Sequence, residues 1–285
     1  MCAVVGASIA RVSLATAATL PTRIVSTAPS ITEMLYELEL GDRVVGVTSY
    51  CHYPPEVRDK PKIGSYLNPN FETTLALQPD LVVVLKEHSE LAEKLRGFGL
   101  PVLELQHNAL EGIYQSMLDL GKRTGADEIA QLRVASIRGG LKAIRKRAGG
   151  LPKRSVMFIV GRTPGTVEDL MAVGSHSFLN ELIDIAGGRN AFEDAIAYYP
   201  RIPREEVYAR RPEVIIDMGD MGETDGVTDQ QRREVVELWD EMPNLPAVKT
   251  GRVYGVADDI FVVPGPRVVR TAERFFEMIH PESSR

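Results

Sequence analysis

The chain has 285 residues and a formal net charge of −6, because 33 Lys and Arg residues stand against 39 Asp and Glu residues. This acidic balance, together with the lack of a basic stripe, argues against nucleic acid as a partner. Beyond the N-terminus there is no run of about 20 apolar residues without charge, so we expect no membrane-spanning segment in the mature chain.

Residues 1–22 form an expected leader. The segment is rich in Ala, Val, Ser and Thr, and residues 15–17 (Ala-Thr-Ala) resemble a signal-peptidase site. However, Arg11 interrupts the apolar stretch and no basic region precedes it. We interpret the segment as a degenerate or mis-started export signal, with a plain leader as the alternative. If it is removed, Cys51 has no intrachain disulfide partner, because Cys2 is the other cysteine of the chain.

The first half of the chain alternates β-branched runs with amphipathic segments, which is typical of βα units. Strands are expected at residues 23–26, 44–47, 81–85 and 102–105. A helix should begin on Ser30 or Thr32 as its N-cap and end at Gly41, because hydroxyl side chains cap helices and glycine closes them. A further helix is expected over residues 89–98.

From about residue 113 to residue 147 the pattern is helical, with apolar residues at three- and four-residue spacing. We assign residues 125–150 to one long helix between two lobes, in which the pair Gly139-Gly140 permits a bend. A second set of βα units follows. Its strands are expected at residues 155–160 and 253–256, and its helices at 177–186, 229–239 and 266–279.

Each half contains one copy of the same helix-Pro-strand unit, displaced by 133 residues. Glu72 stands in the first copy where Glu205 stands in the second, and Pro79 corresponds to Pro212. In each copy the proline ends a short helix, and a buried strand of β-branched residues follows. Such junctions also recur by chance in α/β proteins, but the matched glutamates favour two similar lobes.

These elements predict an α/β protein with two Rossmann-like lobes, each with a mainly parallel sheet, joined by one long α-helix. The lobes are expected at residues 23–124 and 151–285. A helical connection restricts hinging more than a flexible linker does. Ligands of such sheets bind at the carboxyl ends of the strands, here in a cleft between the lobes.

Several stretches of the sequence carry a family resemblance. In chain order they are residues 28–38 (APSITEMLYEL), 41–47 (GDRVVGV), 50–56 (YCHYPPE), 62–64 (KIG), 177–183 (SFLNELI) and 187–190 (GGRN). Together they resemble the helical-backbone substrate-binding proteins of ABC importers, the class III type of periplasmic binding protein, which take up iron complexes and cobalamin. The tract Tyr-Cys-x-Tyr-Pro-Pro-Glu most resembles the cobalamin-binding branch.

The resemblance implies a monomer that is periplasmic, or extracytoplasmic and membrane-associated, and that delivers its ligand to a permease dimer of an ABC transporter. In that family each lobe offers one surface glutamate to arginines of the permease. By position these are Glu72 and Glu205, with Glu206 as a neighbouring alternative. A carboxylate accepts a bidentate arginine contact, and two separated contacts fix the orientation on a two-fold partner. The alternative interpretation is that Glu72 and Glu205 are ordinary acidic residues, which the helix dipole favours near a helix N-terminus.

The resemblance also implies that the ligand is a corrinoid, with cobalamin foremost. Its flat ring needs aromatic walls, and its amide arms need hydrogen-bonding partners. The candidate ligand-binding residues in the expected cleft are Ser30, Tyr50, Tyr53, Tyr66, Arg162, Tyr199, Asp259 and Phe261. The chain departs from the family in Trp239, its only tryptophan, which we expect to pack inside the protein. It departs also in Leu85, which stands where an aromatic residue is expected.

Two alternatives stay open. A ferric siderophore or haem could occupy the same cleft, with Arg162 pairing with the carboxylates of the ligand. A corrinoid-handling protein that is not exported would fit the weak leader. No metal ion or cofactor is expected, since no pair of the five histidines has the spacing of a zinc site. Nor is an enzyme expected, because the sequence lacks the Walker, nucleophile-elbow, H-E-x-x-H and dinucleotide-binding motifs.

Overall fold

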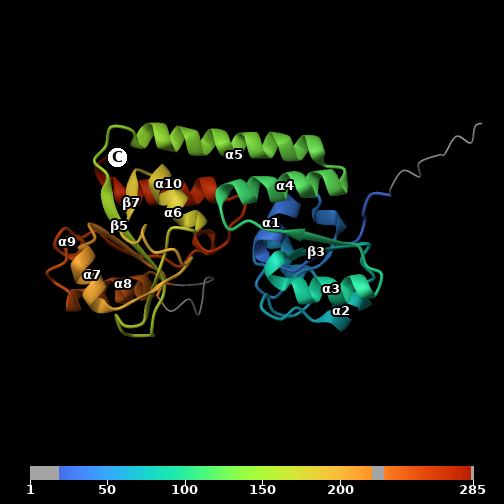
Figure 1. Ribbon diagram of the computed structural model, residues 1–285, viewed down its shortest axis with the longest axis horizontal. Coiled ribbons are helices and arrows are strands. Elements are labelled where there is room, and N and C mark those ends of the chain that lie inside the picture. Colours follow the sequence, from blue (N-terminus) through green and yellow to red (C-terminus); the bar gives the residue numbers. More distant parts are fainter. Residues whose placement is uncertain (1–18, 220–227, 284–285) are drawn as a thin grey trace, which may run out of the picture.

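The computed structural model describes residues 19–219 and 228–283, which form two α/β lobes beneath one long helix (Figure 1). The expected cleavage motif at residues 15–17 lies outside the described residues. Within the described ranges, no helix is both long enough and apolar enough to cross a membrane.

The first lobe is built on a parallel sheet that has four strands in the described part of the chain. They are β1 (Ile24–Ser26), β2 (Val44–Gly46), β3 (Leu81–Leu85) and β4 (Val102–Leu105). Their order in the sheet is β2-β1-β3-β4, and every neighbouring pair is parallel. Strands β1 and β3 are buried throughout, as expected for central strands of a parallel sheet covered on both faces. All of these strands fall where the sequence predicts them.

The helices of the first lobe are α1 (Pro29–Glu37), α2 (Phe71–Ala76), α3 (Ser89–Gly97) and α4 (Leu110–Thr124). The predicted start of α1 is wrong: its N-cap is Ala28 and Pro29 opens the first turn, so that Ser30 lies inside the helix. Proline is favoured there because its φ is already helical and its missing N–H would be unpaired anyway. The predicted end at Gly41 is also wrong, since Glu39 already leaves the helix with φ 62°.

The second lobe contains a larger, mixed sheet. Its strands are β5 (Arg154–Gly161), β6 (Leu170–Ala172), β7 (Gly188–Asn190), β8 (Arg201–Ile202), β9 (Val214–Asp217) and β10 (Val253–Gly255). The order is β10-β9-β5-β6-β8, with β7 paired to β5. Pairs β5–β9, β9–β10 and β5–β7 are parallel, whereas β5–β6 and β6–β8 are antiparallel. The sequence predicts β5, β9 and β10 but misses the three others, which are too short to show a period.

The helices of the second lobe are α6 (Phe178–Ile185), α7 (Arg204–Arg210), α8 (Asp229–Leu238), α9 (Pro246–Lys249) and α10 (Val268–Ile279). Side-chain caps explain where two of them begin. Ser177 accepts a hydrogen bond from the backbone of Leu179 at the start of α6. Thr228 and Gln231 form a reciprocal capping box at the start of α8.

Helix α5 (Asp127–Ala148) runs along both lobes (Figure 1) and contacts α4, α6 and α10. Its 22 residues correspond to about 33 Å at 1.5 Å per residue. The helix continues through the Gly139-Gly140 pair. A Cβ on Gly140 would lie 2.9 Å from a methyl carbon of Val269 in α10, whereas Gly139 has open space. Gly140 therefore permits close packing of α5 on α10.

The internal repeat has a matching backbone conformation in the two lobes. The residues before the two prolines, Gln78 and Arg211, have φ of 47° and 48°, which is uncommon outside glycine. The acids after the prolines, Asp80 and Glu213, each donate a backbone N–H at 2.9 Å to a residue at the start of the adjacent strand, Arg23 just before β1 and Ser155 in β5. Their carboxylates accept a backbone N–H back from that strand at 2.8 and 2.9 Å. The two units are therefore alike in structure as well as in sequence.

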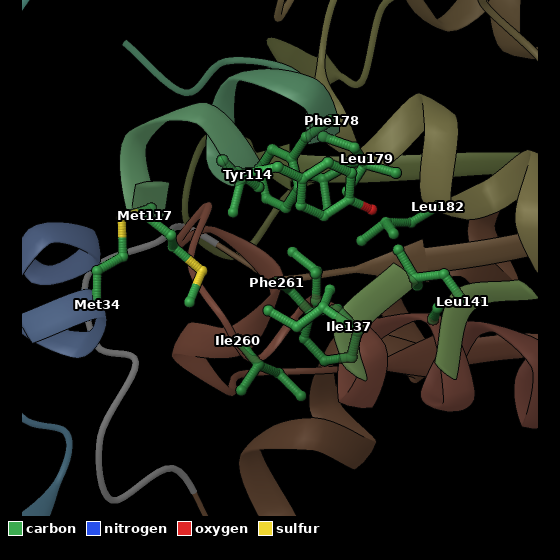
Figure 2. Close-up of a cluster of buried hydrophobic side chains, with 14 of the residues drawn as sticks. Met34, Tyr114, Met117, Ile137, Leu141, Phe178, Leu179, Leu182, Ile260 and Phe261 are labelled. Carbon is green, nitrogen blue, oxygen red and sulfur yellow. The ribbon is translucent and has the colours of Figure 1, made fainter. Parts of the chain in front are cut away.

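The lobes share a hydrophobic core beneath α4 and α5. Figure 2 shows Met34 of α1 beside Met117 of α4, and Ile137 of α5 beside Phe261 of the second lobe. These residues and Phe178 of α6 belong to one continuous cluster of buried side chains. Because wide separation of the lobes would break this close packing, the core restricts the motion between them.

Candidate ligand site and docking surface

Tyr199 of the second lobe influences Tyr66 of the first lobe electrostatically. Burial raises the pKa of Tyr66, and the electrostatic influence of Glu87 and then of Tyr199 raises it further. Burial raises the pKa of Tyr199 as well, against the effect of a hydrogen bond with Ser177, although 39% of Tyr199 remains exposed. Both phenols therefore stay protonated at neutral pH, and each offers a ring and a hydroxyl donor.

A glycine positions the tyrosines of the second lobe. Gly174 donates its N–H to the carbonyl of Tyr198 at 2.9 Å, and a Cβ on Gly174 would lie 1.9 Å from the carbonyl oxygen of Ala197. Only glycine permits this approach of the two backbones. The ring of Tyr198 then meets the ring of His176 at a centroid distance of 6.0 Å. Its hydroxyl accepts a hydrogen bond from Asn108 of the first lobe at 3.4 Å.

Tyr50 and Tyr53 flank a buried anchor in the first lobe. Between them, the thiol of Cys51 lies 3.1 Å from the hydroxyl of Thr32 and 3.2 Å from that of Thr48. Burial raises the pKa of the Cys51 thiol, so that it stays protonated and holds the loop in place. Tyr50 and Tyr53 are 56% and 42% exposed, which leaves the Tyr50 ring and the face of the Tyr53 ring away from Arg267 open to a ligand.

Arg267 joins the lobes next to Tyr53. Its guanidinium lies over the Tyr53 ring, 4.2 Å from the centroid. It donates from Nε and Nη2 to the two carboxylate oxygens of Glu33, the first at 2.9 Å, and from Nη1 to Asp259 at 2.9 Å. Burial raises the pKa of Glu33 to about 7, although Arg267 opposes this shift. The predicted ligand residue Asp259 is thus engaged in an ion network inside the protein.

Ser30 is buried and bonded within the first lobe. Its hydroxyl lies 2.7 Å from Nε2 of His107, whose Nδ1 lies 3.4 Å from the hydroxyl of Ser116. Burial lowers the pKa of His107 to about 4, so its imidazole is neutral at pH 7. Ser30 therefore connects α1 to the segment after β4, and the structure gives it a partner other than a ligand.

Two further candidates, Arg162 and Phe261, are buried in the second lobe. Arg162 donates from Nε to Asp217 at 3.0 Å, and these side chains are 3% and 0% exposed. Trp239 donates to the same oxygen of Asp217 at 2.8 Å and is itself fully buried, as predicted. Phe261 is 0% exposed and meets Phe158 edge-on. A polar or aromatic residue after a strand can face inward as readily as toward a cleft, and the ligand contact of both residues stays a prediction.

Glu72 and Glu205 occupy the same position in their helices. Each is the second residue, of α2 and α7 respectively, and each is exposed. Helices α2 and α7 both lie on the side of the molecule away from α5 (Figure 1). Among the described residues, neither glutamate has an ion-pair partner, whereas Glu206 pairs with Arg210 at 3.2 Å. Both carboxylates are thus free to meet a partner's cations.

The sequence prediction did not select His88, Asn108, His176 or Arg267. His88 follows β3, and Asn108 follows β4, so a systematic reading of every strand end would have found these two. No sequence pattern marks Arg267, because its hydrogen-bond partner Glu33 is 234 residues away in the sequence.

Two α/β lobes under one long helix, with aromatic residues where the lobes meet, define a two-lobed binding protein. The chain matches the family model described as "Periplasmic binding protein" over residues 24–260, and it belongs to this family. The predicted family and fold class are therefore confirmed. The family consists of substrate-binding transport proteins and is not a class of enzymes. Membership thus implies a small-molecule ligand and a membrane permease as partners.

The chain resembles characterised and uncharacterised relatives over most of its length. It is 32% identical over 271 residues to the uncharacterized ABC transporter substrate-binding lipoprotein YvrC of Bacillus subtilis, covering 92% of this chain and 81% of the relative. It is 28% identical over 250 residues to the vitamin B12-binding protein of Vibrio campbellii, covering 87% and 85%.

Solved structures share the fold. The vitamin B12-binding protein BtuF of Vibrio cholerae superposes with a TM-score of 0.75 at 23% identity, covering 93% of this chain and 98% of that one. The heme-binding protein HutB of the same organism gives a TM-score of 0.77 at 19% identity, covering 91% and 99%.

Proposed function

We propose that this protein is an extracytoplasmic solute-binding protein that captures a corrinoid, foremost cobalamin, between its lobes and delivers it to an ABC-transporter permease. The observation that carries the proposal is the tyrosine pair Tyr198-Tyr199 of the second lobe, which a hydrogen bond from Asn108 to the Tyr198 hydroxyl at 3.4 Å ties to the first lobe. Together with the exposed rings of Tyr50 and Tyr53, it supplies aromatic surfaces on both sides of a flat ligand and hydroxyl donors for its amides.

The chemistry of the junction favours a corrinoid over a carboxylate-bearing ligand. Arg162, the cation that a siderophore or haem would use, is committed to the buried carboxylate of Asp217. Releasing it would leave an unpaired buried charge, which is costly. The vitamin B12-binding relatives, matched over most of both chains, support the same ligand class. The alternative, an iron-chelate or haem carrier, draws on structural neighbours such as HutB.

Delivery is proposed to run through Glu72 and Glu205. Their equal positions in the two lobes suit a two-fold permease dimer, which presents the same cations twice to one monomer of this protein. Since both helices lie on the side away from α5 (Figure 1), one flat partner is able to reach both glutamates. Release would follow when the permease forces the lobes apart against the shared core.

The ligand proposal is tested by removing one tyrosine ring from each lobe. We expect Tyr66→Leu and Tyr199→Leu each to weaken cyanocobalamin binding by up to about tenfold, as measured by isothermal titration calorimetry, because each loses an aromatic contact. Tyr208→Leu is the matched control: Tyr208 is 42% exposed but lies on α7. Unchanged affinity in both cleft variants would contradict the proposed site.

The extracytoplasmic location is tested by fractionation of cells that express the tagged full-length chain. We expect the tag outside the cytoplasmic fraction, bound to the membrane or in the periplasm. A tag that stays with a cytoplasmic marker would favour the non-exported corrinoid-handling alternative while leaving the ligand proposal intact.

A further inference from the structure

His88 stands apart from the other polar residues at the junction, because its ring has an unmatched polar atom. It is the last residue of the short turn after β3 and the N-cap residue of α3. Its ring lies edge-on to the ring of Tyr66, with centroids 5.2 Å apart. In the described part of the chain, Nδ1 is buried without a hydrogen-bond partner. Nε2 is the ring nitrogen that remains open to solvent or to a ligand.

The helix behind His88 decides which nitrogen carries the proton. The first turn of α3 presents backbone N–H groups without intrahelical partners and the positive end of the helix dipole. The side chain of the N-cap residue, His88, accepts no hydrogen bond from these N–H groups. A proton on Nδ1 would be a buried donor without an acceptor, and the positive end of the helix that His88 caps disfavours further positive charge near its ring. Burial lowers the pKa of His88, although Glu87 opposes the shift, so the ring is neutral at pH 7.

A neutral imidazole with its lone pair on Nδ1 carries its hydrogen on Nε2. We infer that His88 is a ligand-recognition residue whose Nε2–H donates a hydrogen bond to an amide oxygen of the bound corrinoid, beside the Tyr66 ring. This inference rests on the proposed function, because it requires a ligand between the lobes. It assigns the residue a hydrogen-bonding role that no sequence pattern indicated.

The same geometry argues against His88 as an axial ligand of the bound metal. Coordination through Nε2 would move the proton to Nδ1, and metal-bound histidines almost always donate that proton to an acceptor. Here Nδ1 has no acceptor among the described residues. The site therefore recognises the periphery of the macrocycle at this point, and not its metal.

Two matched substitutions separate donation from ring packing. His88→Phe keeps an aromatic ring against Tyr66 but removes the donor, whereas His88→Gln keeps an N–H donor at a similar reach. Loss of one hydrogen bond corresponds to about two- to tenfold in affinity. In calorimetric titrations with cyanocobalamin we expect His88→Phe to bind about two- to tenfold more weakly and His88→Gln to bind within about twofold of the wild type.

The proton position is measured independently in the ligand-free protein. A long-range ¹⁵N–¹H correlation spectrum at pH 7, with His88 assigned by its absence in His88→Gln, should show a neutral ring protonated on Nε2. A ring protonated on Nδ1, or on both nitrogens, would overturn the inference.

The titrations have equally definite outcomes. Wild-type affinity in His88→Phe, or an equal loss in His88→Phe and His88→Gln, would overturn the donor role while leaving the proposed function standing. Absence of cyanocobalamin binding by the wild type would overturn the proposed function and this inference together. Thermal unfolding of both variants, expected within a few degrees of the wild type, shows that they fold.

Discussion

Arg267 and Glu33 form an ion pair that joins the two lobes. Glu33 lies within α1 with 2% of its side chain exposed, and Arg267 directly precedes α10 with 13% exposed. A Cβ on Gly265 would lie 2.9 Å from Glu33 Oε2, so the absence of a side chain at that position makes room for the pair. The lobes are thus tied by a nearly buried charge pair as well as by a shared core.

Substitution Arg267→Met should lower the free energy of unfolding by about 3 kcal/mol, because it leaves the buried carboxyl group of Glu33 without its partner. The measurement is urea unfolding at pH 7. Arg274→Met is the matched control: its pair with Glu277 is exposed at both ends, 50% and 46%, and should cost less than about 0.5 kcal/mol. Equal effects of the two substitutions would contradict a structural role for the interlobe pair.

Charge reversal of both docking glutamates should abolish ligand uptake without changing ligand affinity. Glu72→Lys combined with Glu205→Lys turns two attractive contacts with permease arginines into repulsive ones. The readouts are cellular uptake of labelled cobalamin and calorimetric affinity of the purified protein. Glu128→Lys is the control, since Glu128 is likewise the second residue of its helix, α5, and exposed. Helix α5 lies on the opposite side of the molecule from α2 and α7 (Figure 1). Uptake that survives the double reversal would rule out this docking mode.

The adjacent glycines of α5 should respond in opposite directions to alanine. Gly139→Ala places a methyl group in open space and should stabilise the protein by about 1 kcal/mol, because alanine is the better helix former. Gly140→Ala forces the Val269 methyl groups aside and should lose that gain or destabilise. Thermal unfolding of the two variants provides the comparison, and stabilisation by both would show that α5 does not pack closely on α10.

His107 should make stability depend on pH. Because its pKa is lowered from 6.5 to about 4 in the folded protein, the unfolded chain binds a proton more readily. Its contribution is complete above pH 6.5 and is lost as the pH falls toward 4, by up to about 3 kcal/mol. Glu33 acts in the opposite sense: its raised pKa of about 7 favours folding at low pH and loses that contribution as the pH rises from 4.5 to 7.

The His107 contribution is isolated by a difference. Urea unfolding of the wild type and of His107→Gln at pH 4, 5, 6 and 7 should give a stability gap that is largest at pH 7 and shrinks on acidification. The same series on Glu33→Gln should show a steeper loss on acidification than the wild type, since the opposing contribution is gone. A gap for His107→Gln that does not change with pH would disprove a neutral, buried His107.

The sequence predicts the strands and helices well where a pattern is long or punctuated. The helix-Pro-strand repeat places α2, β3, α7 and β9, because proline and buried β-branched runs are strong local signals. It fails for β6, β7 and β8, whose two or three residues are fixed by pairing with β5 and with each other. Tertiary contacts, and not propensity, determine such short strands.

The sequence likewise predicts some features of the candidate site and misses others. Tyr50, Tyr53, Tyr66 and Tyr199 lie on loops, and their place in the cleft and their binding role remain predictions. Arg162 and Phe261 are buried, because the direction of a side chain after a strand depends on packing that sequence does not reveal. The sequence does not indicate a role for His88, because a single histidine forms no recognisable motif. The role inferred for it depends on two structural features, its unpartnered Nδ1 and its position as the N-cap of α3.

The central claim is that the space between the lobes binds a corrinoid. Calorimetric titration of the purified chain with cyanocobalamin, and in parallel with haem and a ferric siderophore, tests it most directly. The account predicts saturable one-to-one binding of cyanocobalamin at about micromolar concentration or below, and at least about 100-fold weaker binding of the two iron compounds, a difference of about 2.7 kcal/mol. Tighter binding of haem or the siderophore than of cyanocobalamin would contradict the claim and assign the protein to the iron-chelate carriers.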